Sequence, residues 1–313
     1  MIDIFERELV LKAGKMLVAS DLISRTWGNV SMRSGDSHFL ITPSGREYTN
    51  LGVEEIVKVS MKDLSYEGDI KPSSEAMVHQ VIYEKRPEVN FIIHTHQDYA
   101  SGVSAMNLDK IPVNPKFTRL GKGVELVKYA LPGSKALAKN VMTSLKTVEG
   151  QGIILKNHGA ICFGKDYQEA FQASSQLEVL CREFLERRGV LFKKTQINPE
   201  NIQFSNGIYS VYNNSDIVMK YCEDNKFLLP FIDDYAQIAP PKMVCDKDKG
   251  ILCSSDTIYE LEAIYSIVSK NCLCYFGAMK APGSKPIGRL DAQKMRKNYI
   301  ENYSKRLINK ENT

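Results

Sequence analysis

The sequence has no long apolar run and no strong charge of one sign, and both absences narrow the possible functions. Its 313 residues carry 41 basic and 37 acidic side chains, a net charge of +4, with lysines and arginines scattered among acids. A nucleic-acid-binding surface would gather basic side chains into a stripe, so we expect no nucleic-acid partner. No stretch approaches the ~18 consecutive apolar residues of a transmembrane helix, so we expect no membrane partner either.

Other familiar signals are also missing. The seven cysteines are odd in number and form no Cys-x-x-Cys pair, which favours reduced, buried thiols over a zinc knuckle. The N-terminal stretch "MIDIFERELVLKAGKM" carries acids and an amphipathic pattern unlike a signal peptide, so we expect a cytoplasmic protein. No Walker or Gly-x-Gly-x-x-Gly loop is present, and nucleotide binding therefore has no support from the sequence.

What is present is the composition of a globular protein, 43% hydrophobic and 25% charged. The patterns alternate between helix and strand up to about residue 189, which predicts a layered α/β or α+β domain. The clearest helix begins at Asp166, where Glu169 completes a capping-box spacing, and ends at Gly189. The other predictions are helices over 4–23, from Ser73 or Ser74 as N-cap to before Pro87, and over 134–145, and strands over 30–32, 39–42, 89–96 and both halves of 150–164.

The pattern of apolar and polar residues changes after residue 190. The polar stretch 191–207 is typical of a linker, and it is followed by a predicted helix over 256–270, a strand over 271–279 ("NCLCYFGAM") and a charged helix over 291–307. The length alone fits one large domain with an addition, or two domains.

Two histidines stand one residue apart at the end of an apolar run, "NFIIHTHQDYA". Alternate strand residues face the same side, so His94 and His96 project together and could bind a metal ion. A third ligand would be His158, which interrupts the strand run "GQGIILKNHGAICFG" where a side chain can leave the sheet. The competing interpretation is a pair of satisfied polar residues on a half-buried strand.

The stretch "PSSEAMVH" supplies serine hydroxyls and backbone N–H groups at the start of a predicted helix, a suitable site for an anion, and places Glu75 directly after them. An ordinary helix cap is the competing interpretation. We interpret His79, one turn further on, as a structural histidine. The loops "GNVS" and "TPSG" combine glycine with small polar side chains that let backbone N–H groups approach phosphate, although both are also common turns.

In order and spacing, "GNVS", "ITPSG", "SSE", "HTH" and "KNHGA" resemble the motifs of the class II aldolase/adducin family over about residues 1–190. The resemblance implies a three-layer α/β/α fold with a largely antiparallel central sheet and assembly as a homotetramer. We therefore expect a catalytic domain over residues 1–192 and a C-terminal α/β extension over 193–313. The role of that extension is open, and a degenerate half-repeat is one interpretation.

The resemblance also assigns roles to residues. It implies a divalent metal, Zn²⁺ or another ion such as Mn²⁺, on His94, His96 and His158, and it makes Glu75 the catalytic acid/base. The positions that match the family's contacts to the substrate phosphate are Gly28, Asn29, Ser44, Gly45, Ser73 and Ser74.

The implied reaction is that of a metal-dependent aldehyde-lyase, which cleaves or forms a C–C bond in a small sugar phosphate, joining dihydroxyacetone phosphate to an aldehyde. The related epimerases carry aspartate at the position of Glu75, so the glutamate favours the aldolase branch. Three alternatives stay open: an epimerase or a dehydratase on the same site, or a non-catalytic adducin-like binding protein. The last is suggested by the long extension and by the lack of a tyrosine after His96 that matches the aldolases' proton donor, for which Tyr99, Tyr209 and Tyr212 are candidates.

Overall fold

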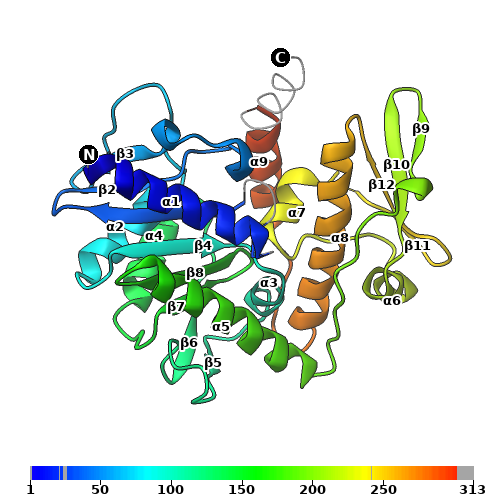
Figure 1. Ribbon diagram of the computed structural model, residues 1–313. Helices are drawn as coiled ribbons and strands as arrows, with labels where there is room; N and C mark the ends of the chain where they lie inside the picture. Colours follow the sequence, from blue (N-terminus) through cyan, green and yellow to red (C-terminus); the bar gives the residue numbers. More distant parts are fainter. Residues whose placement is uncertain (1, 21, 24–26, 241, 302–313) are drawn as a thin grey trace. The chain divides into compact units, whose positions relative to one another are not determined.

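A computed structural model describes residues 2–20, 22–23, 27–240 and 242–301 of the chain (Figure 1). The chain divides into two compact units. One contains Met1–Ala100 and Leu108–Arg182, and the other contains Ser101–Asn107 and Glu183–Thr313. A catalytic domain that ends at residue 192 stays a prediction.

The first unit is built on an eight-stranded sheet with the order β3-β2-β1-β4-β8-β7-β6-β5. Every neighbouring pair is antiparallel except β6 and β7, which are parallel. The predicted largely antiparallel sheet is therefore confirmed. The strands are β1 (Asn29–Ser34), β2 (His38–Ile41), β3 (Val57–Ser60), β4 (Phe91–Thr95), β5 (Lys110–Pro112), β6 (Gly123–Val127), β7 (Gly152–Leu155) and β8 (Gly159–Gly164).

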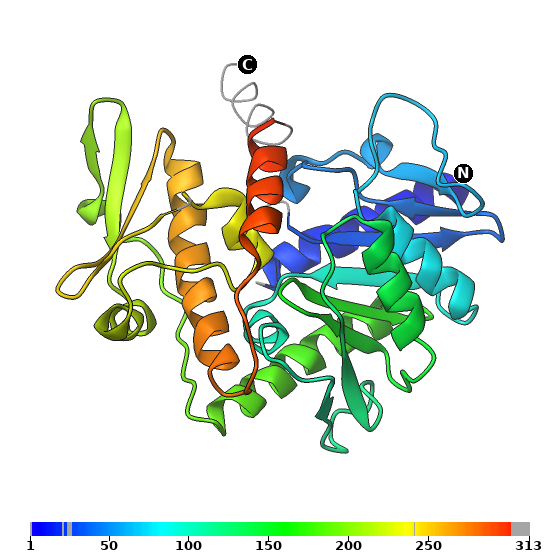
Figure 2. The same ribbon diagram turned by 180° about the vertical axis from the view of Figure 1, so that it is seen from behind.

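Helices cover both faces of this sheet and form the outer layers. One apolar core joins the sheet to α2 (Ala76–Lys85) and α4 (Lys135–Ser144). A second core joins the opposite face to α1 (Ile2–Ala19) and α5 (Tyr167–Glu186). Figure 1 shows α1 and α5 in front of the sheet, and Figure 2 shows α2 and α4 from behind. Because both faces are covered, central strands such as β4 are buried at every position. The predicted three-layer arrangement is confirmed.

Local sequence signals explain several of these elements. The Glu169 backbone N–H donates to Asp166 Oδ1 at 2.9 Å, so the predicted cap of α5 is present. Ser134 caps α4 by accepting from the Leu137 N–H at 3.2 Å. The short helix α3 (Asp98–Ser104) follows β4. Its first residues, up to Ala100, belong to the first unit, and the rest, from Ser101, belong to the second.

The second unit contains a four-stranded antiparallel sheet with the order β11-β12-β10-β9. Its central helix α8 is buried along most of its length. None of the helices in the described ranges combines the length and the apolar composition that a membrane crossing needs. The elements are β9 (Gln203–Ser205), β10 (Ile208–Asn213), α6 (Asp216–Asp224), α7 (Asp233–Ile238), β11 (Cys245–Asp246), β12 (Gly250–Ser255), α8 (Ile258–Ala278) and α9 (Arg289–Tyr299).

The structure differs from the sequence predictions in three places. Residues 271–279 are not a strand: most of them form the last turns of α8, because a helix buried on all sides loses the polar face that identifies it. The stretch 191–207 contains β9 as well as irregular chain. Helix α2 begins at Ala76, so Glu75 and neither serine occupies the N-cap position. The predicted end of the last helix at residue 307 lies outside the described residues.

Candidate metal and catalytic site

The paired histidines lie where β4 ends, in the middle of the first unit's sheet. His94 is the fourth residue of the strand and His96 follows its last residue; their side chains are 1% and 5% exposed. The two Nε2 atoms are 2.9 Å apart. His94 Nδ1 donates to the Ala160 carbonyl oxygen of the neighbouring strand at 2.9 Å, which leaves the lone pair of Nε2 facing its partner. The predicted projection of both imidazoles to one side is therefore observed.

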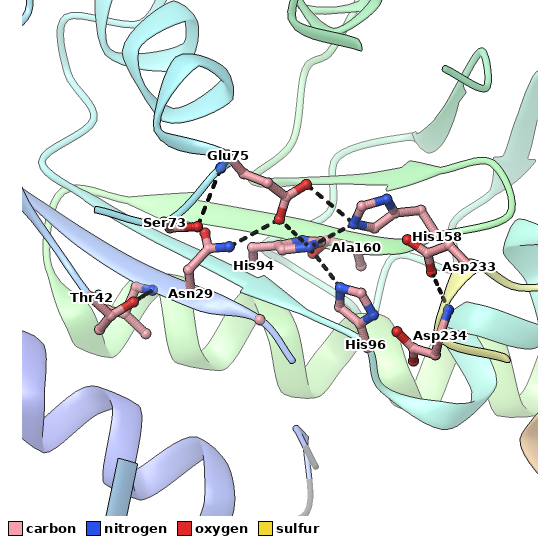
Figure 3. Close-up of polar contacts among 12 residues, drawn as sticks. Asn29, Thr42, Ser73, Glu75, His94, His96, His158, Ala160, Asp233 and Asp234 are labelled. Carbon is pink, nitrogen blue, oxygen red and sulfur yellow. Dashed lines mark hydrogen bonds and ion pairs between the residues drawn. The ribbon is translucent and has the colours of Figure 1, made fainter. Parts of the chain in front are cut away.

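His158 reaches the same point from the turn between β7 and β8. Asn157 adopts a left-handed conformation (φ 57°), and the His158 N–H donates to the Leu155 carbonyl oxygen at 3.1 Å. This tight turn directs the imidazole toward β4, and His158 Nε2 lies 2.9 Å from His94 Nε2. The turn predicted at "NHG" is confirmed, and the structure brings all three predicted metal-ligating histidines together (Figure 3).

Glu75 completes the cluster from the start of α2. Its Oε2 lies 3.0 Å from His94 Nε2 and its Oε1 lies 3.3 Å from His158 Nε2. The carboxylate is nearly inaccessible, with 8% exposure of the residue. Burial alone would raise the pKa of Glu75, but electrostatic interactions with His94, His158 and His96 outweigh it and hold the pKa well below its ordinary value. Glu75 is therefore a carboxylate at neutral pH.

These four side chains satisfy the chemical test for a divalent metal site. One ligand atom from each of Glu75, His94, His96 and His158 lies within 4.8 Å of the others, and all four residues are buried. Three imidazole nitrogens with a nearby carboxylate are a donor set typical of catalytic zinc. Hydrogen bonds alone explain the cluster poorly, because His94 Nε2 carries no proton to share while Nδ1 donates to Ala160. A bound cation would balance the buried carboxylate.

Two of the residues predicted to bind phosphate, Asn29 and Gly28, lie directly beside this cluster. Asn29 Nδ2 donates to Glu75 Oε2 at 3.0 Å, and no contact of this kind was expected from the sequence (Figure 3). Gly28 has a φ of 103°, and a Cβ there would lie 2.6 Å from the His94 carbonyl oxygen. Only glycine lets the beginning of β1 approach the end of β4 this closely.

The other predicted phosphate residues come from two loops that lie side by side. The Ser44 N–H donates to the Lys71 carbonyl oxygen at 3.0 Å, and the Ser73 N–H donates to the Thr42 carbonyl oxygen at 3.1 Å. Gly45 has a φ of 68°. The Ser73 hydroxyl accepts from the Glu75 N–H at 3.3 Å, and Ser74 belongs to the same turn before α2. The structure thus joins "TPSG" and "PSSE", which are 26 residues or more apart in sequence.

The fourth histidine considered, His79, does not join the cluster. Its Nδ1 lies 2.6 Å from the Ser31 hydroxyl oxygen, and that hydroxyl also lies 2.7 Å from the Tyr83 hydroxyl. Burial lowers the pKa of His79 to about 3, so it is neutral. His79 is a structural residue, as the sequence suggested. The contacts of His79 with Ser31 and Tyr83 were not predicted from the sequence. Two patterns could have indicated them: Ser31 alternates with Asn29 along β1, and Tyr83 lies eight residues after Glu75, on the same face of the helix as His79.

Comparison with known proteins agrees with this geometry. The model of a protein family described as the class II aldolase and adducin N-terminal domain matches residues 8–185. The chain belongs to the class II aldolase and adducin family. The matched residues include the whole His/Glu cluster, and class II aldolases are metal-dependent enzymes.

Individual relatives within the family have more than one reaction in their names. An L-fuculose phosphate aldolase of Methanococcus maripaludis is 36% identical over 155 residues, which cover 50% of this chain and 82% of that protein. A 3-oxo-tetronate 4-phosphate decarboxylase of Haemophilus influenzae is 31% identical over 195 residues, 60% of this chain and 91% of that protein. A solved L-fuculose 1-phosphate aldolase has a TM-score of 0.54 at 28% identity, covering 62% of this chain and 91% of that structure.

Proposed function

We propose that this chain is a metal-dependent aldolase, an aldehyde-lyase that cleaves or forms a C–C bond in a small sugar phosphate, with dihydroxyacetone phosphate as one partner and an aldehyde as the other. The observation that carries the proposal is the buried convergence of His94, His96 and His158 on one point beside the Glu75 carboxylate. The similarity to L-fuculose phosphate aldolases supports it.

Three histidines would hold the cation, and we propose Zn²⁺, or another divalent ion such as Mn²⁺, because neutral imidazole nitrogens suit both. When bound, such an ion supplies a Lewis acid for the negative charge that develops on substrate oxygens as the C–C bond breaks. The His94 Nδ1 contact to Ala160 fixes that imidazole's tautomer and orientation.

Glu75 is the proposed acid/base. In the synthetic direction, its carboxylate would take a proton from the carbon next to the carbonyl of dihydroxyacetone phosphate, and in cleavage it would return one. The low pKa keeps the carboxylate ionised at neutral pH, so that it has a lone pair free to accept a proton. Its burial would keep bulk water from the proton it carries, and its position beside the histidines supports a role at the carbon that reacts.

The substrate phosphate would bind where the two loops meet at the beginning of α2. Proposed contacts come from Gly28, Asn29, Ser44, Gly45, Ser73 and Ser74. Hydroxyl groups and backbone N–H groups at the positive end of a ten-residue helix favour a dianion. The joined loops "TPSG" and "PSSE" support this placement.

A second candidate reaction is decarboxylation of a phosphorylated 3-oxo acid, and the observation that favours it is the similarity to the tetronate phosphate decarboxylase. Both reactions break a C–C bond and leave negative charge beside a carbonyl group, so the same metal and phosphate residues would serve both. They differ in the leaving group, which is an aldehyde in one case and carbon dioxide in the other.

The test is metal analysis of the purified protein combined with a substrate panel, with and without chelator. We expect stoichiometric divalent metal, and retro-aldol turnover of a phosphorylated ketose, detected by NMR, that stops with chelator and returns with metal. Release of carbon dioxide from 3-oxo acid phosphates without aldol turnover would favour the decarboxylase instead. No metal and no turnover would favour an adducin-like binding protein. Light scattering would test the proposed homotetramer in the same samples.

A further inference from the structure

A line of polar contacts joins strand β1 to helix α2 within the first unit. Asn29 Nδ2 donates to Glu75 Oε2 at 3.0 Å. Two residues along the strand, the Ser31 hydroxyl contacts His79 Nδ1 at 2.6 Å and the Tyr83 hydroxyl at 2.7 Å. Two residues further, Arg33 Nη2 donates to the Tyr83 carbonyl oxygen at 2.8 Å. We call these six residues, Asn29, Ser31, Arg33, Glu75, His79 and Tyr83, the polar ladder.

The residues of the polar ladder stay opposite one another because the spacing of alternate strand residues is close to the spacing of residues four apart in a helix. Alternate residues of a strand lie on one face about 6.6 to 6.8 Å apart, and residues four apart in a helix are about 6.0 Å apart along its axis. Positions 29, 31 and 33 of β1 therefore stay opposite positions 75, 79 and 83 of the segment that forms α2. The contacts among Ser31, His79 and Tyr83 are buried, with Ser31 and His79 at 0% and Tyr83 at 1% exposure, and the Arg33 contact is partly buried. Such buried polar contacts specify a single position for the helix on the sheet.

Asn29 occupies the end of the polar ladder that meets the catalytic cluster. It lies directly opposite His94 in the pairing of β1 with β4 and is 4% exposed. The NH₂ group of its amide faces Glu75 Oε2, which leaves Oδ1 on the other side of the amide. Its Oδ1 is also buried, and within the described ranges it has no hydrogen-bond partner.

We propose that Asn29 is a positioning residue that holds the Glu75 carboxylate in the orientation for proton transfer, and that its Oδ1 accepts a hydrogen bond from a hydroxyl group of the substrate. The inference rests on the proposed function. It differs from the role that the family resemblance implies for Asn29, because a phosphate cannot donate to Oδ1 and the donor group of the side chain is already directed at Glu75.

Two variants of Asn29 separate positioning from phosphate binding. Asn29→Ala removes both polar atoms, while Asn29→Asp keeps the volume and replaces the donor by an acceptor that repels Glu75. The matched control is Ser44→Ala, in the predicted phosphate loop. Each metal-loaded protein is assayed by NMR for exchange of the carbon-bound hydrogen of dihydroxyacetone phosphate in D₂O, a reaction that requires the base, the metal and the bound ketose but no aldehyde.

Positioning predicts that the maximal exchange rate falls about 10- to 100-fold in both Asn29 variants, because a misplaced base loses that much. KM changes by less than about threefold in Asn29→Asp, which keeps an acceptor for the substrate hydroxyl, and rises further in Asn29→Ala, which removes Oδ1. Ser44→Ala shows the opposite division, because it raises KM by a larger factor than it lowers the maximal rate. The inference is overturned if the Asn29 variants raise KM and keep the maximal exchange rate.

A binding measurement gives a second readout that does not depend on turnover. Inorganic phosphate is titrated into the metal-free proteins by calorimetry. We expect Asn29→Ala to bind phosphate as the unmodified chain does and Ser44→Ala to bind it more weakly. If Asn29→Ala loses phosphate affinity to the same extent as Ser44→Ala, Asn29 is a phosphate contact and the inference is wrong.

Failure of the proposed function looks different. In that case the unmodified, metal-loaded protein catalyses neither exchange nor aldol turnover, and the role of Asn29 is decided by the phosphate titration alone. Circular dichroism and thermal unfolding check each variant, and Asn29→Asp carries the test if Asn29→Ala does not fold.

Discussion

His94 Nε2 and His158 Nε2 lie 2.9 Å apart, although 64 residues separate them in the sequence. The contact exists because β8 pairs with β4 in the sheet and because Asn157, in a left-handed turn, directs His158 back toward the strand. Both imidazoles are buried beside the Glu75 carboxylate. The stability of this buried cluster therefore depends on the cation that we propose it binds.

Replacing a ligand should remove the metal. We expect His158→Ala to lose bound metal, which is measured by elemental analysis of protein freed of excess ion, and to lose activity with it. The matched control is His38→Ala, which changes a partly exposed histidine on β2 whose Nδ1 contacts the Ser37 hydroxyl. Equal metal content in both variants would contradict the proposed ligand set.

Replacing the base should leave the metal in place. Glu75→Gln keeps the shape of the side chain but cannot take up a proton, so kcat should fall about 10²- to 10⁴-fold. The three histidines remain, and metal content should stay stoichiometric. Glu84→Gln, an exposed position on the same helix, is the control and should behave as the unmodified chain. A Glu75→Gln protein with full activity would exclude Glu75 as the acid/base.

Gly159 should tolerate no side chain. A Cβ at this position would overlap the Thr95 carbonyl oxygen and lie 3.3 Å from the His96 ring. Gly159→Ala should destabilise the protein by about 1 to 3 kcal/mol, the usual cost of overpacking, and weaken metal binding because Thr95 and His96 must move. Thermal unfolding and metal titration measure the two effects. Gly288→Ala is the control, since no atom lies within 4 Å of the added Cβ; if both variants unfold alike, the steric argument fails.

His79 should make stability depend on pH. Burial lowers its pKa to about 3 in the folded protein, while an unfolded chain has a histidine pKa of about 6.5. Above about pH 6.5 neither state binds this proton. As pH falls from there toward 3, only the unfolded state binds it, so the free energy of unfolding drops by about 1.4 kcal/mol per pH unit.

His79→Gln removes this titration while keeping a polar group near Ser31. Urea unfolding of the metal-free proteins at pH 7 and pH 5 should show a loss for the unmodified chain about 2 kcal/mol larger than for the variant. The metal-ligating histidines are the same in both proteins, so the difference isolates His79. Identical losses would mean that His79 is not neutral in the folded state.

The local predictions succeeded where a signal lies within a few residues. The cap at Asp166, the turn at Asn157 and the apolar run of β4 each predicted the element that the structure contains. They failed where an element is buried on several sides, because its sequence then lacks the alternation of apolar and polar residues that identifies it. Helix α8 is surrounded by apolar neighbours, so the stretch 271–279 has no polar face and resembles a buried strand. The short strands β9 and β12 are specified mainly by pairing with β10, which a linear pattern does not reveal.

The candidate site divides in the same way. The sequence by itself determined the chemistry available: three histidines, a glutamate after two serines, and glycines at tight turns, in the order and spacing of the class II aldolase and adducin family. Only the tertiary structure decided which atoms meet. The pairing of β1 with β4 sets Asn29 against His94, and the match of strand and helix periods directs the Asn29 amide to Glu75, because these contacts depend on the packing of segments 46 residues apart.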